Sequence, residues 1–413
     1  MKYVILYAEG LADCPRQELA GKTPLQAAST PHLDRLVIGS ELGLLSVVPE
    51  NGPSDGGFMG TSILGYDPRK YYQGPGPLEA ASLGVGVGEH DVVYRCTMVT
   101  LKPESQSGTK GNGPDIKKLG PHVVMDDATA GLITTEEARE LIDAINEQLG
   151  SETIQFYPGS GHRHVMVWVN GKTRAVCVDP QSLIGRSIAD ALPTGDGAEI
   201  LRKLMDASLV ILKSHPVNEV RREAGEKPAN CLWLWGEGRA IPWPSLPERF
   251  PVSGAVISSS DVHRGLGIVA GLKVVESEQL AAADLRTRAV VALDELRRQD
   301  FAYVHLDLPD EVVYDGDPKA KVGAIEAIDR EFMQPFLDGL EKMGPFRLVM
   351  VSNSGTVHQE HADQGTWFYA YFDSMVQSST EKNQRFTETD ARASVLPPRD
   401  TTKFVVRLFA KGT

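Results

Sequence analysis

Short apolar runs alternate along the chain with longer amphipathic segments. Four of these runs, at residues 3–7, 255–258, 302–306 and 347–351, are rich in β-branched and aromatic residues. Apolar runs of about four to eight residues predict buried strands. Residues 198–214 show instead the spacing of an amphipathic helix. Strands separated by helices predict an α/β fold with a mostly parallel sheet and helices on both of its faces.

Polar residues follow each of these predicted strands. Glu9 comes after the first, Asp261 and Arg264 after the second, Asp310 after the third and Asn353 after the fourth. The carboxyl ends of parallel strands meet at one edge of a sheet, where such folds bind their ligands. We therefore expect a site at this edge. A turn role for Glu9, and an ion pair between Asp261 and Arg264 that braces the edge, are the structural alternatives.

A second, smaller unit is expected in the first half of the chain. A helix beginning near Thr134 is followed by short strands at 165–169 and 174–178. This order indicates an inserted α+β lid or substrate domain at 102–194. We expect residues 1–101 and 195–413 to form the discontinuous core domain.

Composition narrows the class of protein. The 413 residues are 41% hydrophobic and 23% charged, with a net charge of -13. This acidic balance argues against nucleic-acid and anionic-membrane partners, which need basic surfaces. No apolar run approaches the roughly 20 residues that span a bilayer. The four scattered cysteines show no metal-binding spacing, so we expect a cytoplasmic protein with reduced thiols.

Ser54 stands in a Gly/Pro turn ahead of a small-residue helical segment. Its hydroxyl and the neighbouring backbone N–H groups could face a phosphate or act as a nucleophile. The competing interpretation is an ordinary helix N-cap, since Ser-Asp before an apolar run is what a helix start requires. The turn alone leaves both interpretations open.

Several motifs in the same order resemble one family from Met1 to about Phe372. They are Gly21-Lys22-Thr23-Pro24-Leu25, Thr30-Pro31-His32-Leu33-Asp34-Arg35-Leu36, Leu64-Gly65-Tyr66-Asp67-Pro68, Leu78-Glu79-Ala80-Ala81, His215-Pro216-Val217-Asn218 and Asp261-Val262-His263-Arg264-Gly265-Leu266-Gly267. The family is the archaeal-type cofactor-independent (2,3-bisphosphoglycerate-independent) phosphoglycerate mutases, with the bacterial relatives described as possible homoserine kinases. It belongs to the alkaline phosphatase superfamily.

The resemblance implies a glycolytic isomerase. In such an enzyme two divalent ions, Mn²⁺ or Zn²⁺, neutralise the phosphoryl oxygens and activate a serine. The serine takes the phosphoryl group and returns it to the other hydroxyl of glycerate, which interconverts 3-phosphoglycerate and 2-phosphoglycerate.

Carried over by position, the metal-binding set of that family is incomplete here. Asp310 and His361 match their positions, and Glu9 replaces an aspartate. An Asp-His pair is replaced by Asn353 and Ser354. The remaining departures are Tyr314 for a histidine ligand, Leu132 for a histidine that begins a helix, and Gly56 at the nucleophile position ten residues before Tyr66. Ser54 lies two residues early. Amide and hydroxyl groups are weak ligands for a hard dication.

The anion-binding positions are better retained. The residues that resemble substrate contacts are Arg95, Arg163, Asn230, Asp261 and Arg264. Arginine forks suit phosphate and carboxylate groups. We expect a small phosphorylated or carboxylate ligand.

Hypotheses of different classes follow. The first is a pseudoenzyme, in which the mutase fold serves binding or regulation, with a protein as a possible partner. The second is an active phosphoryl-transfer enzyme, whether mutase, phosphatase or homoserine-kinase-like, that uses the shifted Ser54 and a reduced metal site. A third is a metal-free binder of phosphorylated sugars. The combined changes at Tyr314, Asn353 and Ser354 favour the first.

Overall fold

The computed structural model describes residues 1–46, 56–104, 116–276, 280, 283–308, 312, 316–354, 367–376 and 384–410, with the backbone alone at Ser354. These residues form two compact units. Unit 1 comprises Met1–Tyr72 and Pro242–Thr413, and unit 2 comprises Gln73–Ile241. Residues 73–101 and 195–241, which we assigned to the core domain, therefore fold with unit 2. The reason is strand pairing, because the strands at both ends of unit 2 belong to its own sheet.

The sheet of unit 1 has the strand order β11-β10-β12-β1-β13-β14-β2-β15 in the described residues. In chain order the strands are β1 (Lys2–Ala12), β2 (Glu41–Ser46), β10 (Gly254–Ile257), β11 (Lys273–Val274), β12 (Phe301–Leu306), β13 (Phe346–Ser354), β14 (Phe368–Asp373) and β15 (Arg399–Asp400). β1 pairs in parallel with β12 and β13, and β10 pairs in parallel with β11 and β12. β14 is antiparallel to both neighbours. The mostly parallel sheet predicted from the sequence is confirmed.

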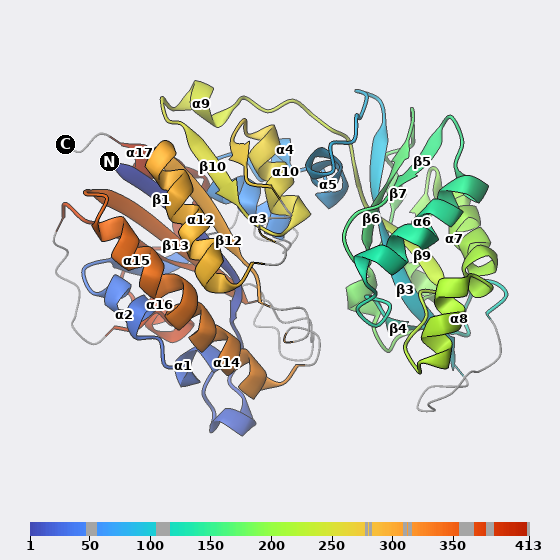
Figure 1. The fold of residues 1–413 in the computed structure, drawn as a ribbon, viewed down its shortest axis with the longest axis horizontal. Helices are drawn as coiled ribbons and strands as arrows, with labels where there is room; N and C mark the ends of the chain where they lie inside the picture. The colour runs from blue at the N-terminus through green and yellow to red at the C-terminus, as the bar shows by residue number, and fades with distance from the viewer. Residues whose placement is uncertain are drawn as a thin grey trace. The chain divides into compact units, whose positions relative to one another are not determined.

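Helices cover both faces of this sheet, and Figure 1 shows α12 and α15 lying side by side. The helices of unit 1 are α1 (Pro24–Ala27), α2 (Pro31–Val37), α3 (Gly56–Ile63), α4 (Pro68–Tyr71), α9 (Leu246–Arg249), α10 (Asp261–Val269), α12 (Leu285–Arg298), α14 (Pro318–Ala327), α15 (Gln334–Glu341), α16 (Glu388–Ala393) and α17 (Phe404–Phe409). Unit 1 also contains short 3₁₀ turns and a π-helical turn, namely η1 (Gln17–Leu19), η7 (Thr401–Lys403) and η5 (Ile328–Met333).

The side chains of β1 point alternately to the two faces of the sheet, as they do in any β-strand. Val4 and Leu6 join the core that α2, α12 and α15 cover. Tyr3 and Tyr7 face the other way, where their rings contact Phe409 of α17 and His263 of α10. The central strand is therefore buried on both sides, and its carboxyl end is held in a fixed position.

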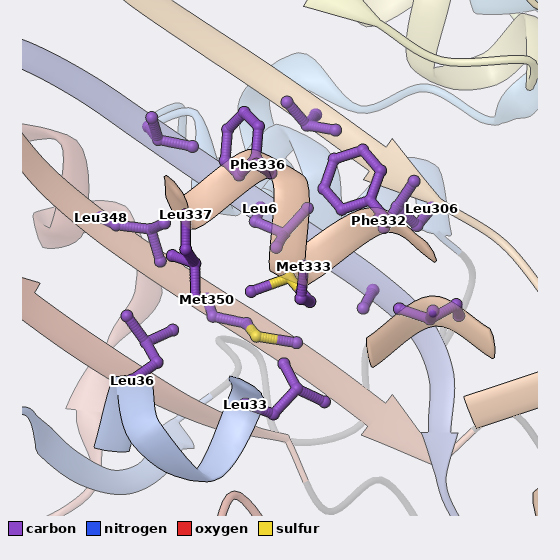
Figure 2. Packing of buried hydrophobic residues seen from close by; sticks show 14 of the residues in the cluster. Leu6, Leu33, Leu36, Leu306, Phe332, Met333, Phe336, Leu337, Leu348 and Met350 are labelled. Atoms are coloured by element: carbon purple, nitrogen blue, oxygen red, sulfur yellow. The ribbon is translucent and has the colours of Figure 1, made fainter. Parts of the chain in front are cut away.

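Figure 2 shows the core on the first of these faces. Large side chains from β1, β12 and β13 meet those of η5, α15 and α2, and the labelled residues are Leu6, Leu33, Leu36, Leu306, Phe332, Met333, Phe336, Leu337, Leu348 and Met350. Each such side chain contributes about 1.5–3 kcal/mol when fully buried. This packing is what keeps the strand ends of unit 1 in place.

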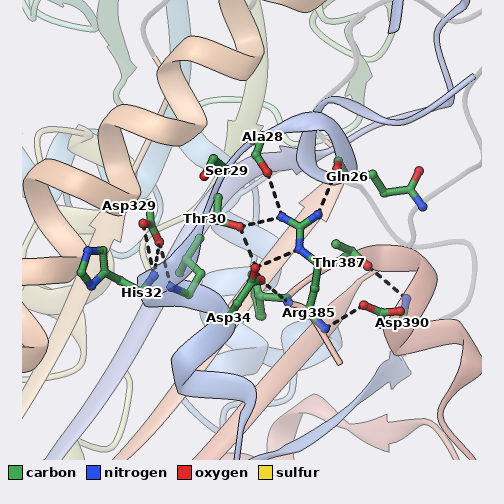
Figure 3. A network of polar contacts seen from close by, with 12 residues as sticks. Gln26, Ala28, Ser29, Thr30, His32, Asp34, Asp329, Arg385, Thr387 and Asp390 are labelled. Carbon is green, nitrogen blue, oxygen red and sulfur yellow. Dashed lines mark hydrogen bonds and ion pairs between the residues drawn. The ribbon is translucent and has the colours of Figure 1, made fainter. Parts of the chain in front are cut away.

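A polar network ties the C-terminal segment to the N-terminal helices of unit 1 (Figure 3). The Arg385 guanidinium donates to Asp34 at 2.8 Å and to the carbonyl oxygens of Gln26 and Ala28 at 3.0 and 2.8 Å. Asp329 accepts the backbone N–H of Leu33 at 2.7 Å. That carboxylate satisfies an amide that the first turn of α2 leaves unpaired.

Unit 2 has an antiparallel sheet in which β3 is central. Its strands are β3 (Val92–Pro103), β4 (Val123–Asp127), β5 (Ile154–Tyr157), β6 (Arg163–Trp168) and β9 (Cys231–Gly238), with a separate pair β7 (Ala175–Val176) and β8 (Thr194–Gly195). Its helices are α5 (Pro75–Ser82), α6 (Thr135–Leu149), α7 (Ala198–Lys213) and α8 (Pro216–Glu223), with 3₁₀ turns η3 (Pro180–Leu183) and η4 (Ala189–Ala191). The predicted helix start at Thr134 is confirmed by its capping box.

Candidate functional site

Four of the sequence-predicted site residues lie outside the described residues. They are Ser54, Asp310, Tyr314 and His361, and the side chain of Ser354 joins them. The roles expected for these residues stay predictions. The strand ends and helix starts of unit 1 that the structure describes define the rest of the site.

The carboxyl end of β1 is fastened to β13 by side chains of β13. Asn353, which is 3% exposed, accepts the backbone N–H of Gly10 through Oδ1 at 2.8 Å. Ser352 donates its hydroxyl to the carbonyl of Ala8 at 2.7 Å. These two bonds flank Glu9 and hold the backbone that carries it. One of the two lone pairs of the Asn353 Oδ1 atom is thereby occupied by a hydrogen bond within the protein.

Glu9 meets two buried histidines from different elements of unit 1. The Nε2 atom of His305, on β12, lies 3.0 Å from Oε2 of Glu9. The Nε2 atom of His263, on α10, lies 3.7 Å from the same oxygen. The two imidazole rings stack with centroids 3.7 Å apart. Among the described residues this cluster could hold a metal ion, because its ligand atoms all lie within 4.8 Å of one another.

Two hydroxyl groups orient these imidazoles from behind. Nδ1 of His263 lies 2.9 Å from the hydroxyl of Tyr303, and Nδ1 of His305 lies 3.1 Å from the hydroxyl of Ser258. Each ring therefore presents its Nε2 atom to Glu9. A hydroxyl can donate or accept, so either tautomer of each ring can be satisfied in this arrangement.

The charges in the cluster follow from its burial and from the contacts among its members. Burial raises the pKa of the Glu9 carboxyl, but hydrogen bonds with His263 and His305 outweigh that effect and hold its pKa well below the usual range. Burial lowers the pKa of His263 to about 4, and the neighbouring His305 adds to the shift. At neutral pH the cluster consequently contains an ionised carboxylate beside a neutral His263 imidazole.

Gly56, at the position where the resemblance implies a nucleophile, lies directly against the cluster. A Cβ atom there would lie 2.8 and 2.9 Å from the two carboxylate oxygens of Glu9 and 3.0 Å from Nε2 of His263. Real Cβ atoms essentially never approach closer than 3.0 Å. The extra methylene of Glu9, relative to aspartate, and the missing side chain of Gly56 thus occupy complementary space.

Arg264 and Asp261 lie on the first turns of α10. Arg264 is 8% exposed, and its Nε and Nη1 atoms are buried without a hydrogen-bond partner in the described part of the chain. Asp261, which begins the helix, has a partner of its own. A buried guanidinium with unpaired N–H groups costs free energy unless an anion satisfies it.

The other predicted substrate contacts belong to unit 2 and carry protein contacts there. Arg95 donates from Nε to Glu79 at 2.8 Å and lies over the ring of Trp235. The side-chain amide of Asn230 exchanges two hydrogen bonds of 2.8 Å with the backbone of Leu101. Arg163 begins β6 opposite Thr97 of β3. Ligand contact by these side chains stays a prediction.

Sequence reasoning did not select His263 and His305 as site residues. His305 lies inside an apolar strand, and His263 follows Asp261 on a helix start, so neither shows metal-ligand spacing. Their common feature is visible only in the fold, since Glu9 and His305 lie 296 residues apart. The sequence did contain one signal. His305 stands within an apolar run that predicts a buried strand, and a buried imidazole needs a polar partner.

A family model described as 2,3-bisphosphoglycerate-independent phosphoglycerate mutase matches residues 39–218 of this chain. A probable enzyme of that name from Geobacter sulfurreducens is 42% identical over 359 residues, which cover 86% of each chain. The relative from Methanosarcina barkeri is 35% identical over 361 residues, again 86% of each chain. The chain therefore belongs to the 2,3-bisphosphoglycerate-independent phosphoglycerate mutase family.

Solved structures support the fold. A protein from Pyrococcus horikoshii superposes with a TM-score of 0.71 at 24% identity, covering 98% of this chain and 96% of its own. The cofactor-independent phosphoglycerate mutase of Thermoplasma acidophilum gives a TM-score of 0.56 at 24% identity, covering 99% of both chains. In the described residues we find no helix long and apolar enough to cross a membrane.

Proposed function

We propose that this protein is a binding member of the mutase family that has lost the transfer of a phosphoryl group between 3-phosphoglycerate and 2-phosphoglycerate. Its ligand is a small phosphorylated or carboxylate compound. The four free cysteines are compatible with a cytoplasmic role. A regulatory role through a protein partner is a further part of this proposal.

The two-ion centre implied by the family resemblance does not fit the described residues. The Asn353 oxygen at one ligand position accepts the Gly10 N–H at 2.8 Å. Glu9 reaches the two histidines instead, and its carboxylate oxygens lie 2.8 and 2.9 Å from the place that a Cβ atom on Gly56 would take. Asn353 would offer an ion of an Mn²⁺ or Zn²⁺ pair only a neutral amide oxygen that already accepts one hydrogen bond, which makes it a weak ligand. The described residues therefore support no reaction step through such a pair.

The observation that carries the binding function is the Arg264 guanidinium. It is buried, and Nε and Nη1 have no hydrogen-bond partner in the segments that the structure describes. A guanidinium fork binds a phosphate or carboxylate through two adjacent N–H groups, either Nε with Nη2 or Nη1 with Nη2, so an anion on one of these sides would satisfy either Nε or Nη1 and bond to Nη2 as well. Each charge-assisted bond contributes about 1.5–3 kcal/mol, so an anion would turn an unfavourable group into a favourable one.

Isothermal titration calorimetry with 3-phosphoglycerate and with inorganic phosphate tests the proposal. We expect saturable binding to the wild type. Arg264→Met should weaken it by about 100-fold or more, because two bonds worth roughly 3 kcal/mol together are lost. The affinity of Arg264→Lys, which keeps the positive charge but not the bidentate guanidinium, should lie between the affinities of the wild type and of Arg264→Met. Equal affinity in wild type and Arg264→Met would contradict the assignment.

A second candidate function is an active phosphoryl-transfer enzyme that uses Ser54 and a reduced metal site. The observation that favours it is the Glu9, His263 and His305 cluster, which could hold one ion. The assay that separates the two functions is turnover of 3-phosphoglycerate by the wild type and by Ser54→Ala. Turnover that depends on Ser54 would favour the enzyme.

A further inference from the structure

The Glu9, His263 and His305 cluster has the composition of a metal site rather than of an ordinary polar core contact. It brings one carboxylate and two imidazoles together from β1, α10 and β12. The imidazole side chains are 2% and 1% exposed, whereas Glu9 is 30% exposed. Three protein ligands of the type His₂Glu with one open position characterise catalytic zinc sites.

The contacts behind the imidazoles are those that metal-bound histidines require. A ligating imidazole usually donates its other N–H to an oxygen, which fixes its tautomer and orientation. Here Tyr303 lies 2.9 Å from Nδ1 of His263, and Ser258 lies 3.1 Å from Nδ1 of His305. With these hydroxyls accepting, both Nε2 lone pairs are directed to the side where Glu9 lies.

Gly56 provides an independent observation, because its lack of a side chain lets the ligand atoms lie directly against the backbone of α3. A Cβ at this position would lie within 3.0 Å of both Glu9 oxygens and of Nε2 of His263. Gly60, one turn further along α3, likewise lies against the cluster, since a Cβ there would lie 3.1 Å from the Tyr303 hydroxyl and 3.3 Å from His263. Two glycines on one helix thus keep side chains away from the cluster and its supporting hydroxyl.

We propose that Glu9, His263 and His305 bind a single divalent transition-metal ion of the zinc class, through a carboxylate oxygen and two Nε2 atoms. The set shares only Glu9 with the positions implied by the family resemblance. Imidazole and carboxylate ligands suit Zn²⁺ and Co²⁺ better than Mg²⁺ or Ca²⁺, which prefer oxygen alone. The binding of an anion by Arg264 does not depend on this ion, so either proposal can fail by itself.

The test is a titration of chelator-stripped protein with Co²⁺, followed by visible absorption. We expect saturable d–d bands at about one ion per chain, as one three-ligand site requires. A thiolate charge-transfer band should be absent, since the cluster contains no cysteine. Elemental analysis after Zn²⁺ loading should give the same stoichiometry.

Variants decide whether the ion lies at this cluster. Glu9→Gln and His305→Gln should abolish the bands, while Tyr303→Phe should weaken Co²⁺ binding by about 10–100-fold. The matched control is His164→Gln, which changes an imidazole that is 1% exposed in unit 2. The control should bind as the wild type does. Absence of saturable bands in the wild type, or bands unchanged in Glu9→Gln and His305→Gln, would overturn the proposal.

Discussion

Two arginines of unit 1 are equally buried but differ in their partners, and this difference predicts opposite effects of the same substitution. Arg347 is 7% exposed and Arg264 is 8% exposed. Arg347 donates from Nε to Asp373 at 2.8 Å and from Nη1 to the carbonyl of Leu408 at 3.1 Å. Arg264 leaves Nε and Nη1 without a partner in the residues that the structure describes.

Replacement by methionine keeps much of the aliphatic packing and removes the guanidinium. Breaking a buried pair costs about 3–5 kcal/mol, so Arg347→Met should strongly destabilise the protein. An unsatisfied buried donor costs about 1–3 kcal/mol. Arg264→Met should therefore raise the free energy of unfolding by roughly 1–3 kcal/mol in the absence of ligand.

Urea denaturation with and without phosphate ligand measures both effects. A ligand at 100 times the wild-type dissociation constant stabilises the wild type by about 2.7 kcal/mol, and it stabilises Arg264→Met, which binds about 100-fold more weakly, by only about 0.4 kcal/mol. The stability advantage of Arg264→Met should thus shrink or reverse when ligand is added. If Arg264→Met destabilises the free protein as strongly as Arg347→Met does, the guanidinium is paired in the free protein and this interpretation is wrong.

Three further predictions concern the residues around Glu9. Gly56→Ala should destabilise the protein by about 1–3 kcal/mol, because the added methyl group overpacks against the Glu9 carboxylate. Glu9→Asp should relieve this overpacking, so a double-mutant cycle should show a coupling energy of about 1 kcal/mol between the two positions. A coupling energy near zero would contradict the prediction. Burial lowers the pKa of His263 from 6.5 to about 4 in the folded state. As the pH falls, the unfolded state therefore binds a proton at this residue before the folded state does. The free energy of unfolding should drop by about 3 kcal/mol between pH 6.5 and 4; a profile identical in His263→Gln would exclude this cause. Asn353→Ala leaves the Gly10 N–H unpaired and should cost about 1–3 kcal/mol in chemical denaturation, whereas Asn353→Asp, which keeps an acceptor, should cost less.

The sheet could be predicted because each of its main strands has its own local signal. The run at residues 3–7 is apolar and β-rich, and it lies within β1 (Lys2–Ala12). Thr23 and Thr134 precede helices, and both form the capping boxes that make such starts recognisable. The unit boundaries were harder to predict, since β3 pairs with β9 across more than a hundred residues and no local pattern reports that pairing.

The candidate site was only partly accessible to the same reasoning. Glu9 could be selected because it follows the apolar run at residues 3–7, although β1 (Lys2–Ala12) extends beyond it, and Arg264 because it follows Asp261 in a motif of the family. His305 could not be selected, because it comes close to Glu9 only when β12 pairs with β1 in the register that places His305 opposite Tyr7. The role of Gly56 could not be predicted either. It depends on the closeness of Glu9 and His263 to the place that a Cβ atom would take, and only the folded structure brings these residues together.

The proposed binding function predicts that this protein binds 3-phosphoglycerate without converting it. Phosphorus NMR of 3-phosphoglycerate mixed with near-equimolar protein tests this, with one sample loaded with Zn²⁺ and another with Mn²⁺. We expect a shifted or broadened resonance from bound ligand in the Zn²⁺ sample, and no 2-phosphoglycerate in the protein-free filtrate of either sample over many hours. Formation of 2-phosphoglycerate that disappears in Ser54→Ala would show instead that a rearranged centre still performs the family's reaction.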